Sequence, residues 1–130
     1  MIIARSELTF REAPGRRTAD PFEHSPLPGA SVRVVRLDGD TRRSPHRHPR
    51  THEVMYVVSG TGHLWRDGGF HRVKEGDCIA VAPGVAHATL PDPGTQMQLV
   101  CFFPDGDLAT NLEELQDPPD LRALSEANDG

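Results

Sequence analysis

The residues best suited to chemistry gather in one stretch, GDTRRSPHRHPRTHEVMYVVSG, which runs from Gly39 to Gly60. Within it, three histidines and a glutamate lie close together in sequence: His46, His48, His52 and Glu53. His46 and His48 are two positions apart, so in an extended segment both imidazoles point to the same face. Imidazole nitrogens and a carboxylate oxygen are ligands of first-row transition metals. We therefore hypothesise a metal site in this stretch.

A fourth candidate ligand, His87, ends a second stretch, GDCIAVAPGVAH, that begins at Gly76. A lone histidine is more often a surface or satisfied core residue, and an H-x-H beside proline and arginine can be an exposed polar loop. The conjunction favours a metal site over these alternatives. The H-x-H stands at a strand entrance, an acidic residue opens the next apolar strand, and His87 follows a separate Pro-Gly turn.

Short β-prone segments separated by turn residues position these side chains. The segments recur at roughly 8–12-residue spacing, which is typical of an all-β sandwich or barrel. The clearest of them are residues 30–38, 53–59, 63–66, 70–74, 78–82, 87–90 and 95–103.

The most β-prone run is EVMYVVS, residues 53–59. If Glu53 faces inward, so do Met55 and Val57, whereas Tyr56 faces the other side together with its two valine neighbours. Both faces are apolar, so we expect this strand to be covered on both sides, in the centre of a sandwich or at an oligomer interface.

The ends of the chain have a different character. Residues 2–10 predict one strand near a sheet edge, and the Pro- and Gly-rich residues 11–29 predict an irregular arm. Residues 107–116 predict a helix with leucines at helical spacing and Asp107 as its N-cap, and residues 121–127 predict a further helical turn. We divide the chain into a strand and arm (1–29), a barrel (30–104) and an acidic C-terminal helix or tail (105–130).

Length and charge limit the function classes. The 130 residues are enough for one domain with its own core. No apolar run approaches a membrane span, and the short apolar N-terminus is followed by charges, unlike a signal peptide. The net charge of −5 makes the chain a poor general nucleic-acid binder. We expect a cytoplasmic protein with no nucleic-acid or membrane partner.

Four arginines, at positions 42, 43, 47 and 50, surround the candidate ligands. They form either a cationic rim that attracts an anionic substrate such as a carboxylate or a set of solvated loop charges. The two cysteines, Cys78 and Cys101, lie in apolar runs and outside any C-x-x-C motif. We expect two buried thiols; a disulfide would require that they lie on neighbouring strands.

The two stretches resemble the motifs of the cupin superfamily, small β-barrels built as a double-stranded β-helix or jelly roll. The first motif matches from His46-x-His48 through four residues to Glu53 and six more to Gly60, with Gly39 one residue farther from His46 than usual. In the second, Gly76, Gly84 and His87 have the usual separations. It departs from the family pattern in having Pro83 directly before Gly84 and Pro91 in place of the terminal asparagine.

The resemblance implies a divalent metal ion, which in the family is Fe, Mn, Zn, Ni, Co or Cu. Its four ligand positions fall on His46, His48, Glu53 and His87. His52 has no family role and should point to the opposite face from Glu53. The resemblance also implies a cavity in the barrel, for which the inward candidates, each also a plain core candidate, are Met55, Val57, Trp65, Met97, Leu99, Cys101 and Phe103.

Beyond the metal ligands the sequence offers few acids or bases for the barrel interior, so any catalysis would centre on the metal. We favour a metal-dependent enzyme acting on a small organic molecule, of the dioxygenase, isomerase, cyclase or decarboxylase type. The alternative is a non-catalytic cupin that binds a small ligand or stores a metal. The apolar strand 53–59, the arm and the habit of the family favour a homodimer.

Overall fold

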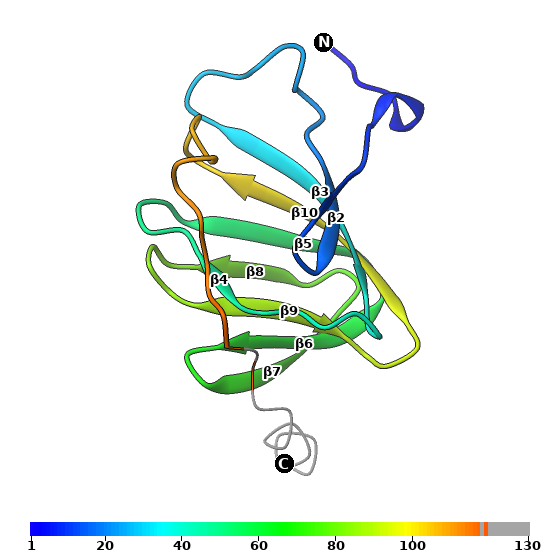
Figure 1. The fold of residues 1–130 in the computed structure, drawn as a ribbon. Helices are drawn as coiled ribbons and strands as arrows, with labels where there is room; N and C mark the ends of the chain where they lie inside the picture. Colours follow the sequence, from blue (N-terminus) through cyan, green and yellow to red (C-terminus); the bar gives the residue numbers. More distant parts are fainter. Residues whose placement is uncertain (118, 120–130) are drawn as a thin grey trace.

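The computed structural model describes residues 1–117 and 119, and its strands form two antiparallel sheets of a jelly-roll barrel (Figure 1). One sheet has the strand order β1-β2-β3-β10-β5-β8 and the other β11-β4-β9-β6-β7. The six strands of the first sheet are β1 (Arg11–Ala13), β2 (Arg16–Ala19), β3 (Ser31–Asp38), β5 (Glu53–Ser59), β8 (Cys78–Val81) and β10 (Gln96–Phe103). The five of the second are β4 (His46–Arg47), β6 (Thr61–Arg66), β7 (Gly69–Lys74), β9 (His87–Pro91) and β11 (Glu113–Glu114).

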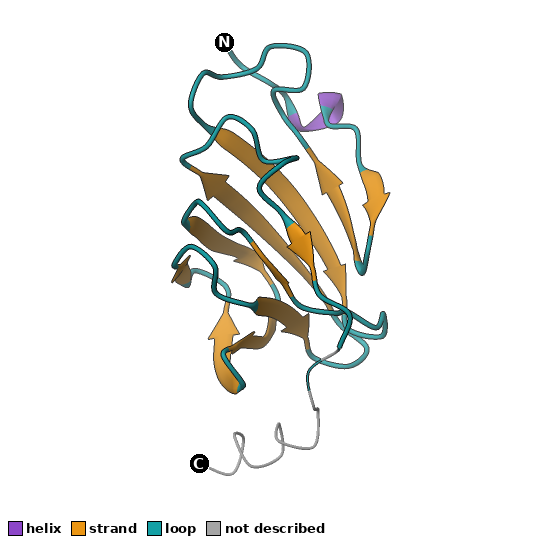
Figure 2. Ribbon diagram, turned by 60° about the vertical axis from the view of Figure 1, so that its left-hand side comes forward, coloured by secondary structure: helices purple, strands orange, loops and turns teal. Residues whose placement is uncertain are grey.

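The core fills the space between the sheets. Alternate side chains of β10 face inward, and those of β5 do the same from Glu53 onward. Figure 2 shows that strands and loops make up almost all of the described chain, apart from one short 3₁₀ helix, η1 (Arg5–Glu7). The buried cluster consists mainly of Val35, Leu37, Met55, Val57, Leu64, Val73, Ile79, Val81, Met97, Leu99, Cys101 and Phe103.

The all-β fold class and the seven clearest strand segments are confirmed, with ends that move by one or two residues. The alternation expected in residues 53–59 is also confirmed. Glu53, Met55 and Val57 are buried, while Val54 and Tyr56 point outward. Register is well specified here because a shift of one residue would move the whole apolar set to the other face.

The prediction for the N-terminal residues is wrong. Residues 2–10 contain η1 and no strand, and the segment expected to be irregular contains β1 and β2. The Pro14-Gly15 turn joins these two strands, with Gly15 at φ +68°, a conformation that glycine adopts without strain. β2 then pairs with β3, so long-range pairing gives order to a segment without periodicity of its own.

The prediction of a C-terminal helix at residues 107–116 is also wrong. The chain makes one turn, closed by the Asn111 N–H donating to the Leu108 carbonyl, and then adds β11 to the edge of β4. An ion pair between Arg47 and Glu113 holds this edge at 2.7 Å. Sheet pairing therefore overrides a weak helical propensity. The helical turn expected at residues 121–127 lies outside the described residues.

The structure differs from two other expectations, one for the outer face of β5 and one for the cysteines. The described residues leave the outer face of β5 uncovered: Val54 is 41%, Tyr56 47% and Phe102 on β10 41% exposed. Cys101 is buried as expected, but Cys78 is exposed, and both thiols are free. The two cysteines lie on β10 and β8 with β5 between them. The described chain contains no helix of the length and apolarity needed to span a bilayer.

Candidate metal centre

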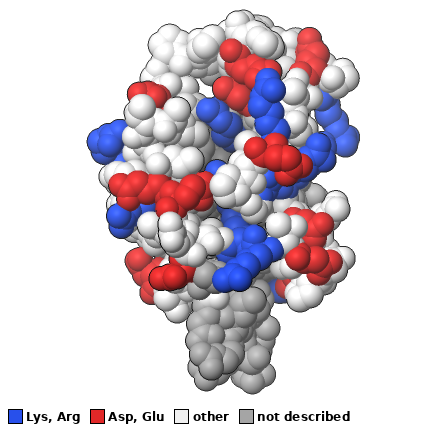
Figure 3. Space-filling model, in the orientation of Figure 1, with Lys and Arg blue, Asp and Glu red and all other residues white. Residues whose placement is uncertain are grey.

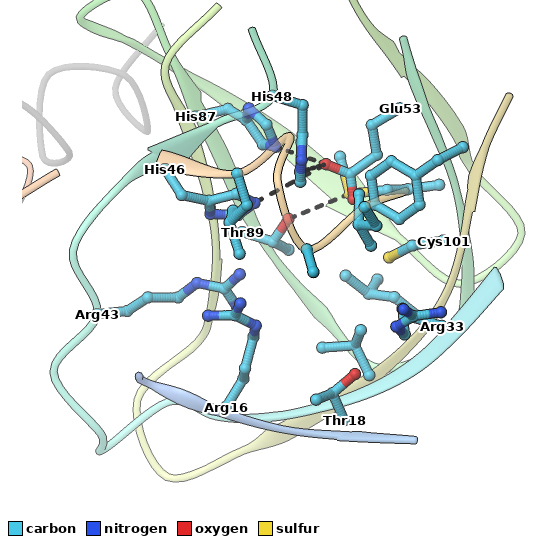
Figure 4. A pocket seen from close by; sticks show the side chains of 17 residues that line it. Arg16, Thr18, Arg33, Arg43, His46, His48, Glu53, His87, Thr89 and Cys101 are labelled. Atoms are coloured by element: carbon cyan, nitrogen blue, oxygen red, sulfur yellow. Dashed lines mark hydrogen bonds and ion pairs between the residues drawn. The ribbon is translucent and has the colours of Figure 1, made fainter. Parts of the chain in front are cut away.

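Four buried side chains from both sheets converge in the barrel interior (Figure 4). His46 lies on β4 and is the register partner of His87 on β9. His48 follows β4, and its carbonyl accepts a hydrogen bond from the N–H of Gly84 in the Pro-Gly turn before β9. Glu53 begins β5 and enters from the opposite sheet. We call His46, His48, Glu53 and His87 the quartet.

The spacing of the quartet suits one ion. Glu53 Oε1 lies 2.7 Å from His87 Nε2, 3.3 Å from His48 Nε2 and 3.9 Å from His46 Nε2. All four ligand atoms lie within 4.8 Å of one another. Ligands about 2.1 Å from a shared octahedral metal are about 3 Å apart when adjacent and about 4 Å when opposite. The quartet is therefore positioned to hold one metal ion.

Backbone carbonyls orient two of the imidazoles. Nδ1 of His48 donates to the carbonyl of Asn111, and Nδ1 of His87 donates to the carbonyl of Val85, each over 2.9 Å. A neutral imidazole has only one N–H. Both rings therefore turn an Nε2 lone pair toward Glu53, which is the orientation that outer hydrogen bonds give to metal-binding histidines.

The hydrogen-bond count at the quartet fits a metal ion. His48 Nε2 is buried and has no hydrogen-bond partner among the described residues. His87 Nε2 lies 2.7 Å from Glu53 Oε1, although both atoms are acceptors when the His87 N–H is used on Val85. A cation at the centre of the quartet would satisfy these lone pairs, which meet from several directions without a shared hydrogen.

Burial and mutual contact set the charge states. Loss of contact with water lowers the pKa of His46 to about 3, so this ring is neutral at pH 7. Burial alone would raise the pKa of Glu53, but the three imidazoles beside it outweigh burial and hold that pKa well below its ordinary value. A neutral imidazole and an ionised carboxylate are the protonation states that metal ligation requires.

A cavity of about 210 Å³ lies beside the quartet. Four of the predicted pocket residues line it: Met55, Leu99, Cys101 and Phe103. The other three do not. Val57 and Met97 are buried in the core, and Trp65 on β6 is half-buried away from the cavity. Beyond the quartet, the lining carries arginines and two threonines and no other carboxylate.

The four arginines near the candidate ligands take different positions. Arg43 is buried and lines the cavity, whereas Arg42 is exposed. Arg47 pairs with Glu113, and Arg50 donates to the carbonyl of Thr110. Figure 3 shows acidic and basic side chains interspersed over one face of the molecule.

A family comparison now agrees with the geometry. Residues 33–103 match the family described as the cupin domain. The chain belongs to the cupin family. No curated protein matches this cupin significantly.

Solved structures share the fold of this cupin at low sequence identity. The nucleoside dehydratase Pac13, which is also known from Streptomyces structures with uridine, is 16% identical with a TM-score of 0.76, covering 92% of this chain and 93% of that one. KdgF from a Halomonas species is 20% identical with a TM-score of 0.69, covering 84% and 99%. A predicted oxalate decarboxylase from Thermotoga maritima is 18% identical with a TM-score of 0.67, covering 79% and 97%.

Several residues at the cupin's cavity were not anticipated from the sequence. Arg16 reaches it from β2, in the segment expected to be an irregular arm, and Thr89 reaches it from β9. Asn111 supports the site from the segment expected to be helical. Arg33 and Thr89 had a sequence signal, because Arg33 has the same parity as the buried Val35 and Thr89 the same parity as His87 within one strand.

Proposed function

We propose that this cupin binds one divalent metal ion through His46, His48, Glu53 and His87 and is a metal-dependent enzyme acting on a small organic molecule. The observation that carries the proposal is the convergence of three imidazoles and one carboxylate beside a cavity. His52 is exposed and faces away from Glu53, so it has no part in the site.

A metal ion bound there would supply Lewis-acid polarisation of a substrate oxygen or, if it were iron, activation of dioxygen. The residues of the chain would do the rest. The imidazoles and Glu53 would hold the ion beside the cavity. Phe103 packs its ring 4.6 Å from that of His48. Leu99, Leu108 and other apolar side chains exclude water from the reacting group.

The reaction types that fit are a dioxygenase, isomerase, cyclase or decarboxylase, with Fe, Mn, Zn, Ni, Co or Cu as the metal. No catalytic acid or base beyond the four ligands is proposed. The printed names of the structural relatives, a nucleoside dehydratase and a predicted oxalate decarboxylase, support small-molecule chemistry as a use of this fold. Fold alone does not choose among the reactions.

We propose in addition a homodimer in the cytoplasm, with no nucleic-acid or membrane partner. Val54, Tyr56 and Phe102 form an exposed apolar patch on the outer face of the six-stranded sheet, where Phe102 is the register partner of Val54. Contiguous exposed apolar side chains of this kind mark interaction surfaces. Two free thiols agree with a reducing compartment.

The second candidate is a cupin that binds a small ligand or stores a metal without catalysis. It is favoured by the same scarcity of acids and bases in the cavity lining. Anaerobic loading with Fe(II), followed by an oxygen-uptake screen over catechols, thiols and diketones, separates the two. Substrate-dependent uptake supports a dioxygenase. If there is no uptake, product analysis with the zinc-, nickel- and manganese-loaded protein tests for Lewis-acid catalysis, and absence of turnover in every form supports the binding protein.

A further inference from the structure

Three arginines line the cavity beside the quartet, and they differ in their partners. Arg16 donates from both terminal nitrogens to Glu114 Oε1, each over 3.1 Å. Arg33 pairs with Asp20 at 3.2 Å. Arg43 is 8% exposed, and its buried Nε and Nη1 have no hydrogen-bond partner among the described residues. Within the described part of the chain, Arg43 is the cavity arginine that forms no ion pair with a carboxylate.

An unpaired guanidinium in this place is unfavourable for the empty protein. Burial lowers the pKa of Arg43 to about 10, and the charge of the neighbouring Arg16 acts in the same direction. The charges of Glu53 and Glu114 oppose this shift, and the group remains protonated at pH 7. A buried charge without a partner destabilises a fold strongly. The group is therefore expected to gain an anionic partner when the cavity is filled.

The position of Arg43 is fixed by packing. A Cβ atom at Gly15, in the turn between β1 and β2, would lie 3.0 Å from Arg43 Cγ and 3.2 Å from its Cα. The hairpin therefore closes against the stem of Arg43 and carries Arg16 to its side. Figure 4 shows the two guanidinium groups together in the cavity, across from Glu53.

With a divalent ion on the quartet, the charges of the cavity lining would favour an anion. Glu114 neutralises Arg16, and Asp20 neutralises Arg33. A divalent ion on the quartet, with Glu53 as its one anionic ligand, would leave a net positive charge there, and Arg43 adds a second. We propose that Arg43 binds a carboxylate of the ligand, so that the substrate is a small carboxylic acid whose remaining part reaches the quartet. The substrate assignment rests on the proposed function; the carboxylate site itself does not.

A carboxylate fits this place better than a phosphate does. A guanidinium edge matches the two oxygens of a carboxylate in a bidentate pair. A phosphate group has three strong acceptor oxygens and a charge near −2, more than the free donors of one guanidinium satisfy. The cavity of about 210 Å³ is also smaller than the 300–1,000 Å³ of typical drug-sized ligand sites.

The test uses benzoate and acetate as probes, with benzamide and acetamide as neutral counterparts and inorganic phosphate as the competing anion. Calorimetric titration of the zinc-loaded wild type is expected to show binding of the carboxylates and at least tenfold weaker binding of the amides. Arg43→Met is expected to weaken carboxylate binding at least tenfold. Arg42→Met, at the exposed neighbouring position, is the matched control and should bind as the wild type does.

The same titrations on chelator-stripped protein separate this proposal from the metal proposal. A carboxylate held by Arg43 still binds without metal and still depends on Arg43, whereas a carboxylate that binds only the metal is lost on stripping. If the quartet held no metal, the Arg43-dependent binding would remain measurable. Binding to Arg43→Met equal to that of the wild type, amides as tight as acids, or phosphate tighter than either carboxylate would each overturn the proposal.

A direct readout guards against a variant that does not fold. The Nε–H resonance of Arg43, assigned by its absence in Arg43→Lys, should shift when benzoate is added to ¹⁵N-labelled wild type. It should remain in place when benzamide is added. A resonance unmoved by saturating benzoate would overturn the proposal whatever the behaviour of Arg43→Met.

Discussion

At the residue scale, the quartet combines polar side chains that would each destabilise the fold if they were buried alone. Buried together, they stabilise one another. His46 and Glu53 are both almost inaccessible to water. Burial keeps His46 neutral and the neighbouring imidazoles keep Glu53 ionised, with the pKa of each below its ordinary value. This arrangement suits a cation and gives the metal-free protein a definite dependence on pH.

We expect the metal-free protein to lose stability as the pH falls below about 6.5. A group whose pKa is lower in the folded state binds its proton first in the unfolded chain, which favours unfolding. With a pKa of about 3, His46 alone contributes up to about 2 kcal/mol between pH 6.5 and 5, at 1.36 kcal/mol per unit. Glu53 acts in the same direction below its unfolded pKa.

Urea unfolding of the metal-free protein at pH 7.5, 6 and 5 measures this slope. The matched variant His46→Gln lacks the titrating ring and should flatten the slope between pH 6.5 and 5. Equal free energies of unfolding at pH 7.5 and 5 in the wild type would contradict the assigned charge states.

Glu53→Gln separates the charge of the fourth ligand from its oxygen atom. The amide oxygen can still coordinate, so we expect metal affinity to fall less than in His87→Ala, which removes a ligand atom. Competition titration with a chromophoric chelator measures both affinities. A loss in Glu53→Gln as large as that in His87→Ala would show that the carboxylate charge dominates binding.

At the element scale, the segment after β10 supports the site. Asn111 is fully buried: its Oδ1 accepts from the Arg50 N–H at 2.8 Å, its Nδ2 donates to Asp105 at 2.6 Å, and its carbonyl accepts from His48. The segment then adds β11 to β4, the strand that carries His46. Two histidines of the quartet therefore depend on residues far along the chain.

We expect Asn111→Ala to lower the free energy of unfolding by about 1–2 kcal/mol, because the Arg50 N–H loses its acceptor. Metal affinity should fall by about tenfold, because the carbonyl of residue 111, which alanine keeps, is no longer held in place by the side-chain bonds and orients His48 less well. Thr110→Ala is the control, since its hydroxyl bonds Asp107 at the surface. Urea unfolding and chelator competition measure the two effects, and unchanged metal affinity would contradict this supporting role.

The elements that could be predicted from sequence are those with a local signal. The alternation of apolar residues in 53–59 and 95–103 predicts two strands and the face of each that packs in the core. The H-x-H spacing places two imidazoles on one face. The hairpin that carries Arg16 is ordered by pairing with β3, and β11 is ordered by pairing with β4. Neither segment has an alternating hydrophobic pattern of its own that would predict a strand. For the same reason Arg16 and Asn111 were missed, and a helix was predicted where the leucines cover the cavity.

At the scale of the whole molecule, the candidate site faces the barrel interior and the apolar patch lies on the outside. Val54, Tyr56 and Phe102 lie on the outer face of the six-stranded sheet, on the opposite side from the cavity-lining residues of the same strands. A second copy that covers the patch would therefore add no residue to the lining of the cavity.

We expect the 14.3 kDa chain to run at about twice its mass, and Tyr56→Arg or Phe102→Glu to shift it toward the monomer. A charge placed in an apolar interface loses hydration without gaining a partner. Light scattering during size-exclusion chromatography measures the mass, with His71→Arg on β7 as the control. Monomeric wild type at all concentrations would contradict the dimer.

The most direct measurement of the central claim is the metal content of untagged protein, purified without added metal and then loaded with Fe(II), Zn(II) or Mn(II). We predict about one ion per chain in the wild type and in His52→Ala, and at least a tenfold loss in His48→Ala and His87→Ala. No bound metal after loading, or an equal loss in His52→Ala, would contradict the assignment of the quartet.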